Sequence, residues 1–221
     1  MFTGIVQGLQ RVVWVRDRDG VRRLRVDLTG IGADVADGAS IAVNGTCLTV
    51  AAHGADWAEF DVIPESLAVT NLADVRPGDA VNVERSARLL DEIGGHRVSG
   101  HISGPGTVRS IAASGGDYRM WIAVDRSLMP YLLHKGFVAV NGASLTISAV
   151  DRPVDRFQIS LIPETLARTT FGTTHAGQVL NVEVDPSTQA VVDTVRAMLA
   201  DPALRAELFD AAGVRTDGSP A

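Results

Sequence analysis

Four matched positions of this chain carry a residue capable of catalysis in one half of the sequence and a different residue in the other half. The pairs are Cys47 with Ser144, Ile5 with His101, Ser86 with Asp185, and Asp37 with Lys135. A thiol or hydroxyl can add to an electrophilic carbon, and an imidazole with a pKa of roughly 6.5 can carry protons at neutral pH. A carboxylate can orient that imidazole or accept a proton, and an ammonium can stabilise a carbanion or enolate-like ring.

Each of these residues also has a purely structural interpretation. Cys47 suits a small buried apolar position, and Ser144 suits a hydroxyl on a strand. His101 suits an interior imidazole whose hydrogen bonds are made, and Lys135 suits a surface cation. Taken one at a time, Cys47 and Lys135 favour the structural interpretation.

The matching rests on two phrases that occur twice at nearly the same spacing. Asn-Gly-x-Cys/Ser-Leu-Thr spans residues 44–49 and 141–146, and Ile-Pro-Glu-Ser/Thr-Leu spans 63–67 and 162–166. Residues 4–8 also match 100–104, and residues 78–84 match 177–183. A correspondence of this length predicts duplication of a whole domain, and each copy should be closed around its own core.

The residues that both copies retain suit binding rather than chemistry. A flat heterocycle with a polyol tail needs oxygen-bearing side chains along the tail, and Thr49, Thr146, Glu65 and Glu164 supply them. The glycine of each Asn-Gly step could let a ring approach the main chain, but a turn requirement explains it equally simply. For these glycines we favour the turn.

Composition limits the classes of protein that the chain can be. With 221 residues, 46% hydrophobic and 21% charged, it is predicted to form two compact domains. A net charge of -6 gives no broad positive field for nucleic acid, and no apolar run is long enough for a membrane span. A single cysteine and a start without a signal-peptide pattern predict the cytoplasm, and the five histidines lack metal-ligand spacing. We therefore expect a small-molecule ligand and no metal.

Short alternating runs, such as residues 21–28, predict about six strands in each half and hence a small antiparallel barrel. Helical turns are expected at 31–36, after Ser66, at 127–134 and after Thr165, with Ser or Thr as caps. The paired glycines of residues 91–96 mark the linker between the barrels.

Apolar residues recur at helical spacing after Pro186, and Pro202 interrupts the run. They are Val191, Val192, Val195, Met198 and Leu199. This helix could fold back on its own barrel or pack against the same helix of other subunits. The predicted parts are an N-terminal barrel (1–96), a C-terminal barrel (97–186), a helix (187–210) and a disordered tail (211–221).

Residues 1–8, the two Asn-Gly phrases, residues 91–96 and residues 99–101 together resemble the alpha-chain riboflavin synthases of the lumazine-binding domain family, over about residues 1 to 195. The resemblance implies an all-β fold of two tandem six-stranded Greek-key antiparallel barrels. It also implies a C-terminal α-helix that assembles a homotrimer, which favours the interface interpretation of the helix. Thr46 stands where some relatives carry a second cysteine.

The resemblance implies a transferase acting in the last step of riboflavin biosynthesis. Two molecules of 6,7-dimethyl-8-ribityllumazine exchange a four-carbon unit, giving riboflavin and 5-amino-6-(D-ribitylamino)uracil without a cofactor. The reacting pair is expected between the N-terminal barrel of one subunit and the C-terminal barrel of its neighbour, where proximity replaces much of the bimolecular entropy cost. Association with lumazine synthase is a further possibility.

The resemblance also implies the site residues. Cys47, His101, Ser144 and Asp185 would be catalytic, with His101 and Ser144 helping to add a nucleophile to one lumazine and Asp185 helping to form the exomethylene anion of the other. The substrate-binding residues would be Gly4, Ile5, Val6, Cys47, Leu48, Thr49, Asp61, Val62, Ile63, Pro64, Glu65, Ser66, Gly100, His101, Ile102, Lys135, Ser144, Leu145, Thr146, Ser160, Leu161, Ile162, Pro163, Glu164 and Thr165.

A non-catalytic lumazine- or flavin-binding protein, such as an optical antenna on the same duplicated barrel, is the alternative. Retention of both phrases and of all four reactive positions favours the enzyme.

Overall fold

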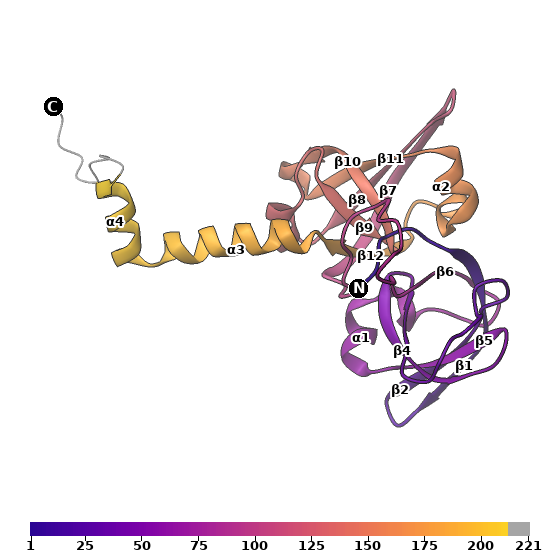
Figure 1. Ribbon diagram of the computed structural model, residues 1–221. Helices are drawn as coiled ribbons and strands as arrows, with labels where there is room; N and C mark the ends of the chain where they lie inside the picture. Colours follow the sequence, from indigo (N-terminus) through magenta and orange to yellow (C-terminus); the bar gives the residue numbers. More distant parts are fainter. Residues whose placement is uncertain (212–221) are drawn as a thin grey trace. The chain divides into compact units, whose positions relative to one another are not determined.

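The computed structural model describes residues 1–211 and contains two closed six-stranded antiparallel barrels there (Figure 1). The strands of the first are β1 (Gly8–Arg18), β2 (Val21–Asp27), β3 (Ser40–Val43), β4 (Thr46–His53), β5 (Trp57–Val62) and β6 (Ala80–Arg85). Those of the second are β7 (Gly104–Ser114), β8 (Asp117–Val124), β9 (Phe137–Val140), β10 (Ala143–Asp151), β11 (Arg156–Leu161) and β12 (Val179–Val184). The ring orders β1-β2-β5-β4-β3-β6 and β7-β8-β11-β10-β9-β12 are equivalent, which confirms the predicted duplicated all-β fold.

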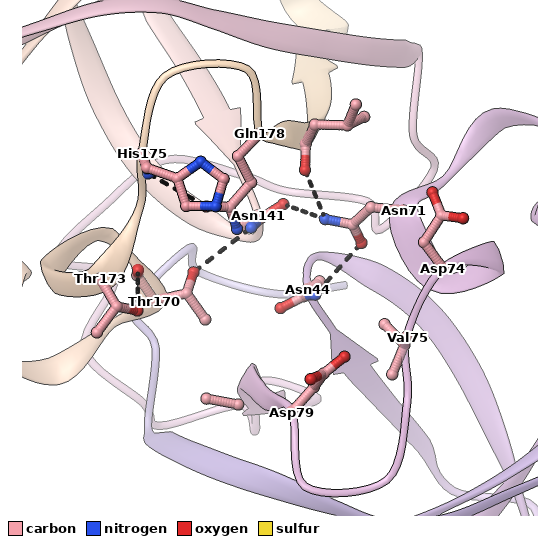
Figure 2. Close-up of a pocket in the computed structure, with 12 residues that line it drawn as sticks. Asn44, Asn71, Asp74, Val75, Asp79, Asn141, Thr170, Thr173, His175 and Gln178 are labelled. Carbon is pink, nitrogen blue, oxygen red and sulfur yellow. Dashed lines mark hydrogen bonds between the residues drawn. The ribbon is translucent and has the colours of Figure 1, made fainter.

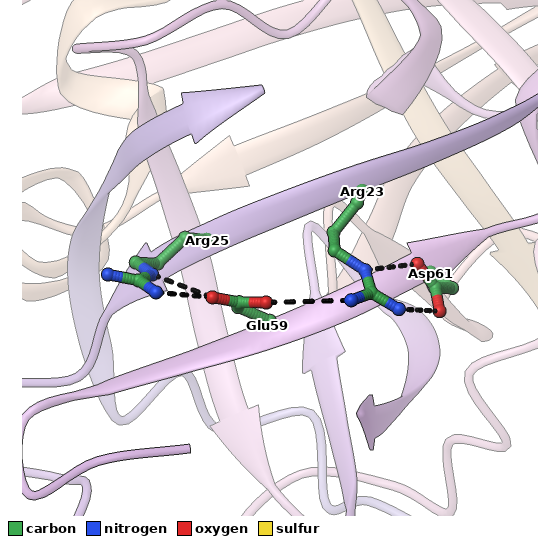
Figure 3. Close-up of polar contacts among 4 residues, drawn as sticks. All are labelled: Arg23, Arg25, Glu59 and Asp61. Atoms are coloured by element: carbon green, nitrogen blue, oxygen red, sulfur yellow. Dashed lines mark hydrogen bonds and ion pairs between the residues drawn. The ribbon is translucent and has the colours of Figure 1, made fainter. Parts of the chain in front are cut away.

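Each barrel has its own core, built by the alternation that the sequence shows. On β2, Leu24 and Val26 are fully buried, whereas Arg23 and Arg25 point outward to carboxylates on β5 (Figure 3). Phe60 anchors the first core, and Phe157 and Phe171 anchor the second. The exposed Arg23–Asp61 pair contributes about 0–1 kcal/mol, so burial of apolar side chains is the main stabilising term.

Short helices follow β5 and β11 at equivalent places. They are α1 (Pro64–Val69), η1 (Asn71–Ala73), α2 (Pro163–Arg168) and η4 (Thr170–Thr173), and η2 (Arg126–Tyr131) and η3 (Arg152–Val154) lie elsewhere in the second barrel. The expected Ser or Thr caps of α1 and α2 are wrong. Both helices begin at a proline, whose fixed φ suits the first helical position, after an isoleucine that makes no side-chain cap.

The helical turn expected at 31–36 is also wrong. This stretch forms separate turns, with Val35 N–H bonded to the carbonyl of Gly32. Gly30 and Asp34 have φ values of 83° and 60°, which interrupt a right-handed helix before that turn and within it.

After Asp185 the chain enters a second compact unit. It contains α3 (Pro186–Ala200) and α4 (Pro202–Ala211), so the predicted single helix of 187–210 is divided at Pro202, which cannot donate a backbone hydrogen bond. Val191, Val195 and Leu199 are exposed on α3. No helix in residues 1–211 is long and apolar enough to cross a membrane. The predicted tail lies outside the described residues except for Ala211.

The two barrels are joined by asparagines that each copy supplies in the same way. Asn82 Nδ2 donates to the carbonyl of Asn141, and Asn181 Nδ2 donates to the carbonyl of Asn44, both at 2.8 Å. The Asn71 side chain bridges Asn44 and Asn141 beside them (Figure 2). All four asparagines of the two repeated steps and strands are buried, so these bonds satisfy groups that water cannot reach.

The Asn-Gly steps lie at the centre of this joint. A Cβ on Gly45 would lie 2.5 Å from the backbone nitrogen of Gly142, and both glycines have positive φ, 80° and 81°. The turn therefore explains only part of the need for glycine at these positions. The two main chains also approach each other too closely for a side chain.

Gly45→Ala is expected to lower the free energy of unfolding by clearly more than Gly38→Ala. Gly38 has nearly the same φ of 79°, but a Cβ added there would meet nothing within 4 Å, so Gly38→Ala reports the left-handed strain alone, about 1–2 kcal/mol. Urea unfolding of the two variants measures the difference. Equal losses would contradict a close contact between the barrels at Gly45.

Candidate functional site

A depression of about 370 Å³ opens on the first barrel beside Cys47. Its lining comes from β4, from the end of β5 and from the start of α1, and consists of Cys47, Leu48, Thr49, Ala51, Asp61, Ile63 and Ser66. All of these except Ala51 are among the predicted substrate-binding residues. The β pleat explains why Cys47, Thr49 and Ala51 face this depression, since the residues that alternate with them on β4 face the core.

A different pocket of about 390 Å³ lies between the barrels and includes Asn44, Asn71 and Asn141 (Figure 2). The amides of these residues bond to one another and hold the joint. None of the predicted site residues lines this pocket.

Asp61, at the rim of the depression, is held by Arg23 across the β2–β5 ladder (Figure 3). Arg23 Nε and Nη2 donate to the two carboxylate oxygens at 2.7 and 2.6 Å. Hydrogen bonding from Arg23 holds the pKa of the Asp61 carboxyl below its usual value. Arg23 is not among the residues predicted from the sequence, although its register opposite Asp61 follows once β2 and β5 are paired.

The corresponding residues of the second barrel occupy equivalent elements. Ser144, Leu145 and Thr146 lie on β10, Ser160 and Leu161 end β11, and Ile162 to Thr165 lead into α2. Ser144 is half-buried like Cys47, and Thr146 is exposed like Thr49.

Lys135 precedes β9 with a left-handed backbone, φ 66°. Its N–H donates to the carbonyl of Ile147 as that of Gly38 donates to Val50, so its counterpart is Gly38 and the predicted match with Asp37 is wrong by one residue. A non-glycine residue pays about 1–2 kcal/mol for this conformation. The second copy therefore keeps a lysine in a conformation for which the first copy uses glycine.

The segment before each barrel also reaches a strand of the other barrel, and residues 4–6 and 100–102 are called the exchanged segments for this reason. The carbonyl of Gly4 accepts from Ser144 N–H at 2.8 Å, and the carbonyl of Gly100 accepts from Cys47 N–H at 2.9 Å. Val6 packs on the core of the second barrel. Each segment therefore bonds to a strand of the opposite barrel as well as to its own barrel, which its place in the sequence does not indicate.

Two buried glutamates fix the exchanged segments. Glu84 accepts from Thr3 N–H, Thr3 Oγ1 and Gly4 N–H, at 2.6, 2.8 and 3.1 Å. Glu183 accepts from Ser99 and Gly100 in the same pattern. Burial raises the pKa of both carboxyls, and the surrounding donors oppose that rise.

The imidazole bonded to Ser144 is that of His96, whereas the histidine predicted to act with Ser144 is His101. His96 Nδ1 lies 2.6 Å from Ser144 Oγ, and its ring stacks on Phe137 with centroids 5.0 Å apart. Burial lowers the pKa of His96, and the charge of Asp185 opposes this effect. His101 is exposed, and its backbone N–H donates to Ser99 Oγ. Comparison of the repeats could not find His96, because it lies in the linker that occurs once between them.

Arg23→Ala is expected to raise the pKa of Asp61 towards its usual value, because the bidentate donor is lost. The lowered pKa stabilises the fold above the pKa of the unfolded chain, and this contribution disappears as pH falls through the folded pKa. A ¹³C-carboxyl NMR titration measures the change. Arg25→Ala is the matched control, since Arg25 pairs with Glu59, and a pKa of Asp61 that is unchanged in Arg23→Ala would contradict the assignment.

Both barrels of this chain are similar to known lumazine-binding proteins. The family model described as lumazine binding domain matches residues 3–86 and again 99–185. The riboflavin synthase of Escherichia coli (strain K12) is 46% identical over 202 residues, which cover 90% of this chain and 94% of that protein. Crystal structures of LumP with riboflavin (27% identity, TM-score 0.76) and with 6,7-dimethyl-8-(1'-D-ribityl) lumazine (26%, TM-score 0.75) cover 84% and 83% of this chain and 100% and 99% of LumP.

Proposed function

This chain belongs to the riboflavin synthase family, and we propose how its two barrels divide the reaction of that enzyme. One molecule of 6,7-dimethyl-8-ribityllumazine binds each type of barrel, and a four-carbon unit passes from one to the other. The products are riboflavin and 5-amino-6-(D-ribitylamino)uracil. The observation that carries the proposal is the similarity to the Escherichia coli riboflavin synthase through both barrels.

The reaction balances without a co-reactant. Two identical molecules become one larger and one smaller product, with no net oxidant, reductant or water. We therefore propose that no cofactor is needed and that the protein contributes positions, hydrogen bonds and proton transfer.

Side chains of each barrel support this use. In the first barrel, the oxygens of Thr49, Asp61 and Ser66 face one depression with Cys47 and suit a ribityl chain. In the second, Lys135 offers a cation that would stabilise negative charge on the ring, such as that of an exomethylene anion. The other predicted contacts of both barrels keep their proposed role as substrate-binding residues.

We assign His101 and Asp185 to one site or the other from the contacts that their neighbouring residues make. His101 follows Gly100, which is bonded to Cys47, so we assign His101 to the Cys47 site rather than to the Ser144 site. Asp185 ends the second barrel close enough to His96 to affect its pKa, so we assign it as the base that takes a proton from a ring methyl group at the Ser144 site.

We also propose that the exposed apolar residues Val191, Val195 and Leu199 of α3 pack against other copies in a homotrimer. The reacting pair would then lie between barrels of neighbouring subunits. A cytoplasmic location and an association with lumazine synthase, which would supply the substrate, remain proposals from the family resemblance.

The antenna alternative is less well supported. The likeness to LumP is 26–27% in sequence identity, against 46% to the Escherichia coli enzyme. The chain also carries candidate reactive residues in both barrels.

Purified protein incubated with 6,7-dimethyl-8-ribityllumazine alone is expected to form riboflavin and the uracil product in equal amounts. Absorbance and chromatography follow both products. Treatment with EDTA followed by gel filtration should leave the rate unchanged, because no metal is proposed. Tight binding without turnover would select the antenna function instead.

Lys135→Gly and Lys135→Ala are expected to weaken riboflavin binding equally, because both remove the ammonium. The glycine variant should be more stable by about 1 kcal/mol, since alanine retains the left-handed strain. Fluorescence titration and urea unfolding measure the two effects. Unchanged riboflavin affinity would remove Lys135 from the site, and equal stability would show that its backbone is not strained.

A further inference from the structure

His96 is buried in a way that makes Ser144 its main polar contact. The residue is 7% exposed, and Nδ1 bonds to Ser144 Oγ at 2.6 Å. Nε2 is buried and has no hydrogen-bond partner within residues 1–211. A buried nitrogen without a partner costs about 1–3 kcal/mol, so a histidine chosen for stability alone would be a poor choice here. An apolar ring stacked on Phe137 would avoid that cost.

The linker brings His96 to Ser144 by a close approach of the main chain. A Cβ on Gly95 would lie 2.2 Å from the carbonyl oxygen of Thr3 and 2.8 Å from Ser144 Cβ. On another side, a Cβ on Gly4 would lie 2.6 Å from the same Ser144 atom. Ser144 is thus enclosed by two segments that carry no side chain at the contact, and the imidazole of His96 supplies the hydrogen bond.

This arrangement distinguishes Ser144 from its counterpart Cys47. Gly100 approaches Cys47 as Gly4 approaches Ser144, but Cys47 lines an open depression. The linker that carries His96 occurs once between the copies and lies on Ser144. Two sites built on one framework are made unequal by a segment that belongs to neither repeat.

We propose that His96 is a positioning residue that holds the Ser144 hydroxyl in one rotamer and so gives the second barrel a role in the reaction different from that of the first. A serine hydroxyl has three staggered positions, and the bond to Nδ1 selects one of them. In either tautomer the bond uses one hydrogen-bonding function of the hydroxyl and leaves the others for the ligand. Misplacement of a reacting group by about 1 Å can cost about 10²-fold in rate, so this selection affects turnover.

The hydrogen bond can be tested without turnover. In protein with ¹⁵N-labelled histidine, the Nδ1 resonance of His96 is expected to move in Ser144→Ala and to stay in place in Cys47→Ala. An Nδ1 resonance that is the same in Ser144→Ala and in the unaltered protein would overturn the proposal. This measurement does not depend on the proposed function.

The kinetic role rests on the proposed function and is tested by double-mutant cycles with lumazine turnover. His96→Phe keeps a ring on Phe137 but removes Nδ1, and it should lower kcat about 10- to 100-fold while riboflavin affinity stays within about threefold. His96→Asn, which places an amide near the position of Nδ1, should recover about tenfold of the loss. Circular dichroism establishes that each variant is folded.

Ser144 and its counterpart Cys47 provide the matched controls. Adding His96→Phe to Ser144→Ala should change kcat by less than about twofold, whereas adding it to Cys47→Ala should multiply the two losses. If the loss in kcat caused by His96→Phe multiplied with the losses of Ser144→Ala and Cys47→Ala alike, His96 would affect turnover without acting through Ser144. That result would overturn the proposal. Absence of lumazine turnover in the unaltered protein would instead overturn the proposed function, and the kinetic role with it, while the NMR result would still decide the hydrogen bond.

Discussion

The buried joint between the barrels is the interaction on which the rest of the structure depends. Asn82 and Asn181 each donate to a carbonyl of the opposite barrel, and Gly45 meets Gly142 with no room for a side chain. Because the joint is built from equivalent residues of both copies, it fixes the barrels in an approximately symmetric pair. Only with the barrels so placed can the segment before each barrel bond to the other barrel, at Cys47 and at Ser144.

The two barrels differ chemically at a few positions of this symmetric pair. Lys135 accepts a left-handed backbone where the first copy has glycine, and the linker adds His96 to the second barrel alone. Both features cost stability, the first through backbone strain and the second through a buried nitrogen without a partner in residues 1–211. A reaction between two identical substrates needs such a difference, because one molecule must give the four-carbon unit and the other must receive it.

The ion pair between Arg23 and Asp61 is a further feature of the first barrel. Arg23 faces outward because β2 alternates, and it meets Asp61 because β2 pairs with β5. The carboxylate at the rim of the depression is therefore kept ionised and fixed in direction, at a site where a polyol would need a constant acceptor. The pair is exposed, so its contribution is to geometry and charge more than to stability.

The sequence by itself determined the duplication, the strand periodicity, the barrel class and most of the lining near Cys47, because these follow from repeated phrases and local alternation. The tertiary structure decided the features that depend on how distant segments pack. The exchange of residues 4–6 and 100–102 depends on the joint, the match of Lys135 with Gly38 depends on strand register, and the pairing of His96 with Ser144 spans 48 residues. A pattern of neighbours along the chain carries no information about which barrel a linker will cover, since that is set by the close approach of main chains at glycines.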